Sequence, residues 1–396
     1  MGVGAASRHY GVDWLRIAAF LLLICYHVGL AFSPWAYEWK SDRTEVWVAQ
    51  PLLALNAWRL GLLFAISGYA SAALFAKHGA AIGAFARGRL ARLGIPLLAA
   101  MVLFNIPQPW VYLATQRGYE GSLAHFALHD YFSFSAVMGD THVPTWMHLW
   151  FVVYLLLYTL VAAALLAMLP AAVRARARAG AVWLLSGWRL LPVGILFIWL
   201  ARHLPGGWEE EHDVVSDLAA HVAYGGLFLF GWTLRGSEAI RASIARQWPI
   251  AAALGLVGMT LVVGVEHRWP GDTVAPPEAW TVFRAARAVQ CWATIVALFG
   301  MADRFFNRDH PWRATLAEAV FPFYIIHQTI ILVAGYAIMD FGWSMSVQWL
   351  AVMSATIVGC VAFYFVGREI GPLRPLIGLR ARKHAPRSPI VRETAA

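Results

Sequence analysis

Charged residues are scarce in this chain. Asp, Glu, Lys and Arg account for 13% of its 396 residues, whereas a soluble domain carries about 25%. Hydrophobic residues account for 60%, and there are 20 tryptophans, the residue type that concentrates at bilayer interfaces. This composition excludes an ordinary water-soluble domain and favours a membrane protein.

Cysteine is scarcer still. The three cysteines, Cys25, Cys291 and Cys360, each lie within an apolar stretch. An odd number of buried thiols excludes a disulfide framework, and their spacing does not fit a set of metal ligands. We therefore expect neither a disulfide nor a bound metal ion.

Acidic residues are also few, and the formal net charge is +9. A basic balance can indicate binding to nucleic acid. Here, however, the basic residues occur in short clusters between apolar segments, and the chain has no basic arm or recognition motif. We predict that the protein does not bind nucleic acid, and we expect its main partner to be the lipid bilayer.

Apolar segments of about 20 residues recur along the chain, and this is the length at which a helix crosses a bilayer. They predict ten spans, at 13–33, 51–76, 93–113, 146–169, 184–203, 214–234, 248–265, 281–301, 316–338 and 345–367. The predicted fold is an all-α polytopic membrane protein whose single membrane domain covers 13–370. Residues 1–12 are predicted to form an N-terminal segment, and residues 371–396 a basic, disordered tail.

The placement of Lys and Arg predicts the orientation, because cytoplasmic loops carry an excess of both. With the N-terminus in the cytoplasm, the outer loops hold only Lys40, Arg43, Arg117, Arg202 and Arg268 of the 31 basic residues. Five more lie within the spans, at Arg16, Arg59, Arg189, Arg284 and Arg287. We predict that both termini are cytoplasmic.

Arg16 and His27 stand eleven residues apart in the first apolar segment. Eleven residues make three helical turns plus about 20°, so both side chains share one helix face and lie roughly 16 Å apart along the axis. Ionisable residues within a membrane helix are costly and mark function. We interpret Arg16, near the inner face, and His27, beyond the midplane, as catalytic.

Two elements near the cytoplasmic side are candidates for binding a phosphorylated co-substrate. Gly68, between Ser67 and Tyr69, permits close backbone approach; the alternative is packing of small residues between helices. Arg89 and Arg92 are spaced i, i+3, so both guanidinium groups share a face and suit phosphate. The alternative for this pair is the ordinary positive charge of an inner loop.

Further polar residues lie within the spans. His327 is expected near mid-depth and His148 near the outer surface, either as site residues or as hydrogen-bonding residues between helices. Arg59 is deeper in the second span and is expected to be paired. Arg284 and Arg287 share a face at the outer end of their span, where we favour extension to the interface over binding of a carboxylate.

These elements resemble the acyltransferase type 3 family of integral membrane O-acyltransferases, and they occur in the order of that family over about residues 9–370. The matching motifs are Arg16-x10-His27, Phe-x-x-Ser-Gly-Tyr at 64–69, Arg89-x-x-Arg92, His-Leu-Trp-Phe at 148–151 and Phe-Pro-Phe-Tyr-x-x-His at 321–327. Within the family, the chain is most similar to the glucan biosynthesis protein C group, whose members are linked to succinylation of periplasmic glucans.

The resemblance implies a membrane O-acyltransferase of the bacterial inner membrane. It would move an acetyl or succinyl group from cytoplasmic acyl-coenzyme A to a hydroxyl of an extracytoplasmic saccharide, such as a periplasmic glucan or a cell-surface polysaccharide. Acyl-coenzyme A is then a co-substrate, and no tightly bound cofactor is implied. The substrate-binding residues implied are His148, Trp150, Tyr324 and His327.

The residues themselves leave alternatives open. His27 is either a general base for the acceptor hydroxyl or is itself acylated. Buried His and Arg also suit a proton-coupled transporter, and a non-catalytic component of a glycan export assembly is a third class. For the enzyme, we expect a polar passage through the bilayer between Arg16 and His27. The sequence favours no particular oligomeric state.

Overall fold

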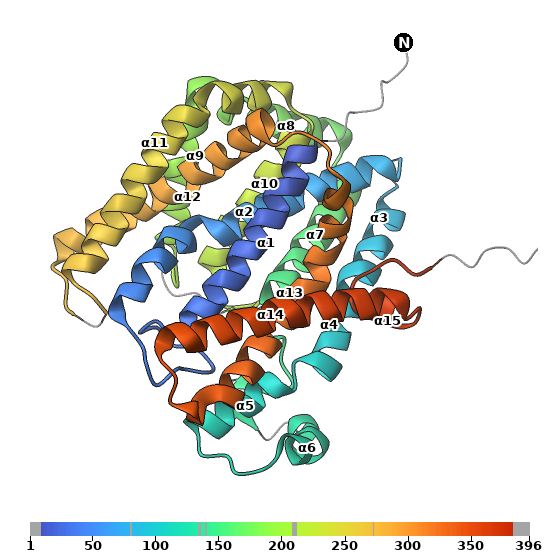
Figure 1. Ribbon diagram of the computed structural model, residues 1–396. Helices are drawn as coiled ribbons and strands as arrows, with labels where there is room; N and C mark the ends of the chain where they lie inside the picture. Colours follow the sequence, from blue (N-terminus) through green and yellow to red (C-terminus); the bar gives the residue numbers. More distant parts are fainter. Residues whose placement is uncertain are drawn as a thin grey trace, which may run out of the picture.

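The computed structural model describes residues 9–79, 81–133, 136–138, 141–207, 212–271 and 273–382. Residues 1–8 of the predicted N-terminal segment and residues 383–396 of the predicted tail lie outside the described residues. The described chain is a bundle of helices (Figure 1), which confirms the all-α class. Its strands, β1 (Val137–Met138) and β2 (Thr141–His142), form one short antiparallel pair.

Within the described residues, seven helices are long and apolar enough to cross a membrane. They are α1 (Tyr10–Leu30), α2 (Ala49–Lys77), α7 (Trp150–Met168), α11 (Glu238–Arg268), α12 (Pro277–Phe305), α13 (Pro311–Ile338) and α14 (Met345–Glu369). Short helices complete the bundle: α6 (Leu123–His125) and α15 (Leu373–Leu376).

Two bent pairs of helices raise the number of candidate spans to nine if each pair is one span. The first runs from α3 (Ile82–Arg89) through α4 (Ile95–Ala99) and two π-helical turns to Phe104, and then bends by 44° into α5 (Pro107–Gln116). The second joins α8 (Ala171–Leu184) to α9 (Leu190–Arg202) at 80°.

The prediction of ten spans is therefore confirmed only in part. The remaining predicted segment, 214–234, does form a helix, α10 (Leu218–Arg235), but α10 is not among the helices above. Its polar and small residues, such as His221 and Gly225, lower its hydropathy. Much of its surface is covered by the protein, because Leu227, Phe228 and other residues along it are buried.

The close crossing of α2 and α10 depends on two glycines. A Cβ atom added to Gly68 would lie 1.9 Å from the carbonyl oxygen of Phe228, and one added to Gly231 would lie 1.8 Å from that of Ala65. Small residues allow membrane helices to approach this closely. In the structure, Gly68 thus has the packing role that was the alternative to co-substrate binding.

Polar contacts connect neighbouring segments at each of the two ends of the bundle. At the predicted inner end, Arg313 Nη1 lies 2.7 Å from Asp13 Oδ2, and Trp14 Nε1 donates to the Arg308 carbonyl at 3.1 Å. At the other end, Gln116 donates to the loop between α1 and α2. Figure 1 shows α5 and α6 together at this second end, at the bottom of the view.

The first part of the predicted tail is folded. Ile377 and Leu379, which follow α15, are buried against Ala319 of α13 and Tyr364 of α14. Apolar side chains in an otherwise basic tail allow this segment to cover the inner end of the bundle. Disorder was expected from residue 371, but residues 371–382 are ordered on the membrane domain.

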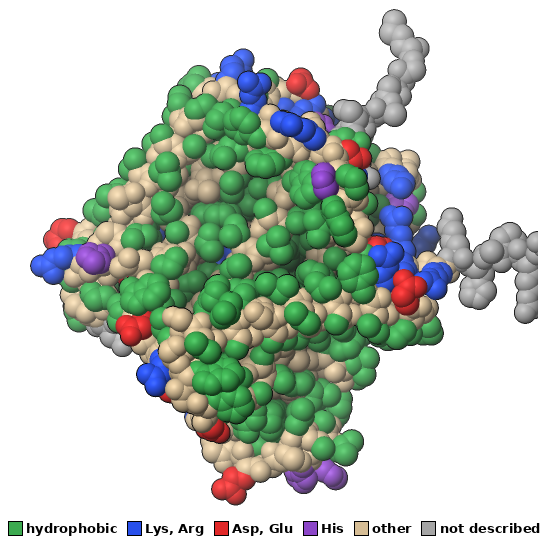
Figure 2. All heavy atoms as spheres, in the orientation of Figure 1, with side chains coloured by type: hydrophobic (Ala, Val, Ile, Leu, Met, Phe, Trp, Pro, Cys, Tyr) green, Lys and Arg blue, Asp and Glu red, His purple; other side chains and the backbone are tan. Residues whose placement is uncertain are grey.

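On the face of the bundle shown in Figure 2, hydrophobic side chains predominate, and Lys and Arg gather near the rims. The exposed large hydrophobic residues of the protein include Leu21 of α1, Leu256 of α11 and Val358 of α14. A contiguous apolar surface of this extent is typical of contact with lipid.

We expect Gly231→Ala to destabilise the protein by about 1–3 kcal/mol, because the new methyl group overlaps the Ala65 carbonyl of α2. The measurement is the thermal unfolding midpoint of the purified protein in detergent. Gly180→Ala in α8 is the control, because an added Cβ there meets nothing within 4 Å. A Gly231→Ala midpoint equal to that of Gly180→Ala would contradict the close crossing.

Candidate active site

His27 of α1 meets His327 of α13 in the interior of the bundle. His27 Nδ1 lies 2.8 Å from His327 Nε2, and the two rings stack with centroids 5.0 Å apart. The His327 side chain is fully buried. Because α1 packs directly against α13, residues 300 positions apart in the chain form one catalytic candidate.

The neighbours of this pair decide which nitrogen atoms carry protons. His327 Nδ1 lies 2.8 Å from the Tyr324 carbonyl oxygen, which only accepts, so this nitrogen donates. The Nε2 of the neutral His327 ring then accepts from His27 Nδ1. The remaining nitrogen of His27, Nε2, is left with a free lone pair and is the basic atom of the pair.

His148 joins the same network from the 3-10 turn Met147–Leu149, which directly precedes α7. Its Nε2 donates to the Tyr324 carbonyl at 3.0 Å, and the Tyr324 hydroxyl donates back to the His148 carbonyl at 2.5 Å. A carbonyl oxygen has two lone pairs, so Tyr324 accepts from both histidines. Three of the predicted site residues therefore share hydrogen bonds with one another, and His27 is joined to them through His327.

A cavity of about 340 Å³ lies beside His27. Of the predicted residues, His27, His148, Trp150 and Tyr324 line it. Its other lining residues are Leu23, Tyr26, Leu30, Asn56, Arg59, Leu60, Phe151, Arg202, His212, Tyr224 and Arg287. Because the predicted outer end of the bundle supplies many of these residues, the cavity lies in the predicted outer half.

Three arginines give this cavity a positive lining. Arg59 lies over the Tyr26 ring, 3.5 Å from its centroid, and Arg287 Nη2 donates to Asn56 Oδ1 at 2.6 Å. Arg202 Nη2 donates to the Tyr224 hydroxyl at 3.3 Å. The described residues that line the cavity include no aspartate or glutamate. Guanidinium groups in surroundings of low polarity attract an anion more strongly than they do in water.

Two sequence interpretations change with this geometry. Arg59 was expected to have a partner that the sequence does not name, and the Tyr26 ring is one. Extension to the interface was favoured for Arg287, and this is wrong, because Arg287 bonds to Asn56 and lines the cavity. The cost of a guanidinium group within an apolar span was the signal that could have identified it.

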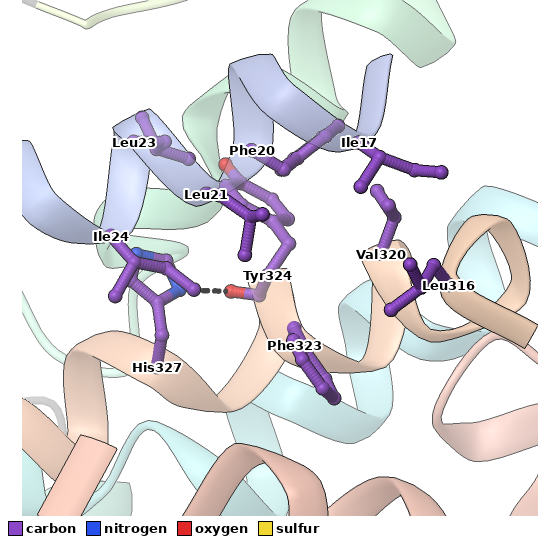
Figure 3. A pocket seen from close by; sticks show the side chains of 10 residues that line it. All are labelled: Ile17, Phe20, Leu21, Leu23, Ile24, Leu316, Val320, Phe323, Tyr324 and His327. Carbon is purple, nitrogen blue, oxygen red and sulfur yellow. Dashed lines mark hydrogen bonds between the residues drawn. The ribbon is translucent and has the colours of Figure 1, made fainter. Parts of the chain in front are cut away.

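Arg16 lies on the inner side of this centre, where its Nη2 donates to the Ala317 carbonyl of α13 at 3.0 Å. Between Arg16 and the histidines, α1 and α13 border a narrow groove of about 20 Å³. Figure 3 shows apolar side chains of both helices along it, with His327 at one end and Tyr324 near the middle. That volume holds about one water molecule, so the expectation of an open polar passage is wrong for this structure.

The predicted co-substrate residues fall into two places. Arg89 is buried beside Arg92, which lies within electrostatic range of Arg16, Glu318 and Arg380. The basic residue that the sequence interpretation missed is Arg380, which the folded segment after α15 brings to this cluster.

Tyr69, by contrast, contacts His9 and Arg235, with ring centroids 6.1 Å apart in the first pair and the Arg235 guanidinium 5.6 Å from the Tyr69 ring centroid. Ser67 lies on the same helix next to the packed Gly68 and is half-buried. Among the described residues, no hydrogen bond, ion pair or ring contact joins Ser67, Gly68 or Tyr69 to the Arg89–Arg92 cluster.

The loop between α1 and α2 adds two residues that sequence reasoning missed. Tyr37 stacks on His27 with ring centroids 6.4 Å apart, and Glu38 Oε1 accepts from Gln328 Nε2 at 3.0 Å. Burial raises the pKa of the Glu38 carboxyl above its ordinary value, although its hydrogen bonds and His212 oppose the shift. No sequence motif marks these residues, because the loop reaches the site only through folding.

A family model described as an acyltransferase domain matches residues 9–365, nearly the whole chain. The chain belongs to the acyltransferase type 3 family. This confirms the family resemblance and the enzyme class, an acyltransferase. The match covers α1, α2, α7 and α13, which carry the histidine network and most of the cavity.

Similar curated proteins include glucans biosynthesis protein C of Escherichia coli (strain K12) and of Shigella dysenteriae serotype 1 (strain Sd197). Each is 30% identical to this chain over 125 residues, which is 32% of this chain. The chain spans about a third of the length of these relatives, 32% in both cases. No solved structure matches the chain.

We expect His327→Leu to lower the rate of acyl transfer by about 10²- to 10⁴-fold, the range of a general-base contribution. The leucine side chain has a similar volume but cannot accept the hydrogen bond from His27 Nδ1–H. In His327→Gln, the side-chain oxygen can accept in place of Nε2, so this variant should recover part of the rate. The measurement is kcat for both variants, with thermal midpoints compared. Equal losses in the two variants would contradict a positioning role for His327.

Proposed function

We propose that this acyltransferase moves an acyl group from cytoplasmic acyl-coenzyme A to a hydroxyl of an extracytoplasmic saccharide. The observation that carries the proposal is the basic Nε2 of His27 on a residue that lines a cavity of about 340 Å³. An oriented imidazole with a free lone pair is suited to remove the proton of an attacking hydroxyl.

In the general-base pathway, the acceptor oxygen attacks the thioester carbonyl carbon while His27 Nε2 takes the hydroxyl proton. The C–S bond then breaks, and the proton passes from His27 to the coenzyme A thiolate. Arg59 and Arg287 lie in the cavity, where a positive charge stabilises the oxyanion of the tetrahedral intermediate.

In the second pathway, His27 Nε2 itself attacks the thioester and expels the thiolate. The acceptor oxygen then attacks the acyl carbon, the C–N bond to His27 breaks, and the hydroxyl proton passes to the coenzyme A thiolate, which leaves His27 neutral again. Both pathways need the same neutral tautomer of His27, so the hydrogen bond to His327 supports either one.

The donor approaches from the inner end in this proposal. Arg16, Arg89 and Arg92 would bind its phosphate groups, and the offset of roughly 16 Å between Arg16 and His27 along α1 suits an extended arm. The groove between α1 and α13 follows this line. Because the groove is narrow in the structure, donor binding must move the apolar side chains that border it.

The cavity favours an acyl group that carries its own negative charge. A succinyl group ends in a carboxylate, which forms charge-assisted and bidentate hydrogen bonds with guanidinium groups. An acetyl group offers no such partner to Arg59, Arg202 and Arg287, which line the cavity. We therefore favour succinyl over acetyl.

The acceptor and the location follow from other observations. The relatives named glucans biosynthesis protein C come from bacteria, which supports a periplasmic glucan as acceptor and the bacterial inner membrane as location. The scarcity of Lys and Arg in the predicted outer loops supports ten spans, with α10 as the tenth, and cytoplasmic termini.

We expect His27→Ala to abolish acyl transfer without unfolding the protein, because the base is lost and a small side chain replaces it next to the cavity. The measurement is transfer of a radiolabelled acyl group from coenzyme A to a gluco-oligosaccharide, with the purified protein in proteoliposomes. His78→Ala, an exposed residue after α2, controls for the loss of a histidine.

Full activity of His27→Ala would end the proposed mechanism. Movement of the oligosaccharide or the donor across the membrane by the unaltered protein, without any acylated product, would favour a transporter instead. Mass spectrometry of cell-envelope glycans with and without the protein identifies the transferred acyl mass.

We expect Arg287→Gln to reduce the preference for succinyl-coenzyme A over acetyl-coenzyme A by about 10- to 100-fold, because a hydrogen bond to a charged group contributes about 1.5–3 kcal/mol. The measurement is kcat/KM for each donor. Arg284→Gln, three residues earlier in α12 and not among the residues lining the cavity, is the control. A preference that is unchanged in Arg287→Gln would contradict a carboxylate site there.

A further inference from the structure

The loop between α1 and α2 holds two consecutive polar side chains beside the histidine pair. The Tyr37 ring lies nearly parallel to that of His27, at 14°. Gln116 Nε2 of α5 donates to the carbonyl oxygens of both Tyr37 and Glu38, at 2.9 Å each. These contacts place the Tyr37 ring beside His27 and hold the backbone of Tyr37 and Glu38 against α5, at the predicted outer end of the bundle.

The residues that follow fix the loop in position. Trp39 is fully buried against Gly335 of α13, where an added Cβ would lie 2.4 Å from the indole ring. Lys40 Nζ donates to the carbonyls of Leu30, at the end of α1, and of Trp35. Tyr37 and Glu38 are therefore held in place on both sides.

Further along, Ser41 Oγ donates to Gln348 Oε1 of α14 at 2.7 Å. Two transmembrane helices, α13 and α14, thus anchor the second half of the loop. An anchored loop can present a polar group at a defined position, which a binding site requires.

Three buried oxygen atoms in this region have no hydrogen-bond partner among the described residues, and neither has the indole nitrogen Nε1 of Trp39. The oxygens are Tyr37 Oη, Glu38 Oε2 and Gln328 Oε1. The other oxygen of Glu38 accepts from Gln328 Nε2 at 3.0 Å, which brings these two side chains together, and Tyr37 and Glu38 are close enough to interact electrostatically. Buried polar atoms normally have hydrogen-bond partners. Each buried polar atom that lacks a partner lowers the free energy of unfolding by about 1–3 kcal/mol.

The chemistry of these atoms defines what they would bind. Glu38 Oε2 accepts as a carboxylate, Gln328 Oε1 accepts, and Tyr37 Oη both donates and accepts. Their complement is a ligand with several hydroxyl groups. A carboxylate or phosphate ligand would bring no proton to the two acceptors and would suit the arginine side of the cavity instead.

Aromatic rings stand near this polar group. His212 is within electrostatic range of Glu38, and its ring stacks on Trp150 of the cavity wall with centroids 4.1 Å apart. A sugar ring has apolar C–H faces as well as hydroxyls, so flat aromatic surfaces beside hydroxyl acceptors are suited to it.

We propose that Tyr37, Glu38 and Gln328 form the acceptor subsite and bind the hydroxyl groups of a neutral saccharide next to His27. This inference rests on the proposed function and names residues for its outer side. Tyr37, Glu38 and Gln328 are not among the residues that line the cavity. The two chemistries therefore lie next to each other: arginines within the cavity for the anionic end of the acyl group, and hydroxyl acceptors beside it for the sugar.

The test compares Glu38→Gln with the unaltered full chain in proteoliposomes. Initial rates are measured against the concentration of a neutral β-linked gluco-oligosaccharide, and separately against that of succinyl-coenzyme A. Hydrolysis of the thioester without acceptor is a third readout. Glu45→Gln, the same change at an exposed position of the same loop, is the matched control.

We expect Glu38→Gln to raise the half-saturating concentration of the oligosaccharide by 10-fold or more, because a charge-assisted hydrogen bond is lost. The half-saturating donor concentration and the acceptor-free hydrolysis should stay as in the unaltered protein. Tyr37→Phe, which removes only Oη, should raise the half-saturating concentration of the oligosaccharide by about 2- to 10-fold, as expected for the loss of a neutral hydrogen bond.

Two results would overturn the inference while the proposed function stands. One is a half-saturating concentration of the oligosaccharide that is the same in Glu38→Gln and Tyr37→Phe as in Glu45→Gln. The other is an equal loss in all three readouts, which shows a structural role for the loop. Absence of transfer to any saccharide by the unaltered protein would overturn the proposed function itself and the acceptor subsite with it.

Discussion

A single hydrogen bond between two imidazole rings connects α1 to α13 at the centre of the bundle, and the chemistry of the site depends on its direction. The Tyr324 carbonyl accepts a hydrogen bond from His327 Nδ1–H. In the hydrogen bond between the two rings, His327 Nε2 must therefore accept and His27 Nδ1 must donate. In apolar surroundings, a donor facing a donor would be costly, and this makes one arrangement of protons strongly preferred. The basic nitrogen of His27 is therefore set by a backbone oxygen on another helix.

The rest of the site is arranged around that pair by charge. Guanidinium groups line the cavity beside His27, and their contacts include the Tyr26 ring, the Asn56 amide, the Tyr224 hydroxyl and the Gly207 carbonyl. Holding such groups in a membrane bundle costs stability, and the cost is typical of functional positions. The inner arginines and the outer loop lie at opposite ends of α1, so the donor and the acceptor that we propose would reach one base from two sides.

The sequence predicted the local parts of this arrangement well. Arg16 and His27 do lie toward α13, as their shared helix face indicated, because a helix has a regular period that any apolar sequence of this length adopts. Prediction failed where the role of a residue depends on contacts with residues that are distant in the chain. From the sequence, Arg287 was predicted to extend to the interface, whereas in the structure it bonds to Asn56 of α2. The segment of α10 was predicted to be an ordinary span, whereas much of its surface is covered by protein.

Composition and period by themselves determined that this chain is a helical membrane protein with a polar face on its first helix, because both follow from short stretches of residues. The family resemblance also rests on short motifs, and it covers nearly the whole chain. Only the tertiary structure decided that His27 bonds to His327, that three arginines from three helices surround one cavity, and that the space between Arg16 and His27 is narrow and apolar. Packing between helices determines these features, and no local pattern encodes which side chains will meet.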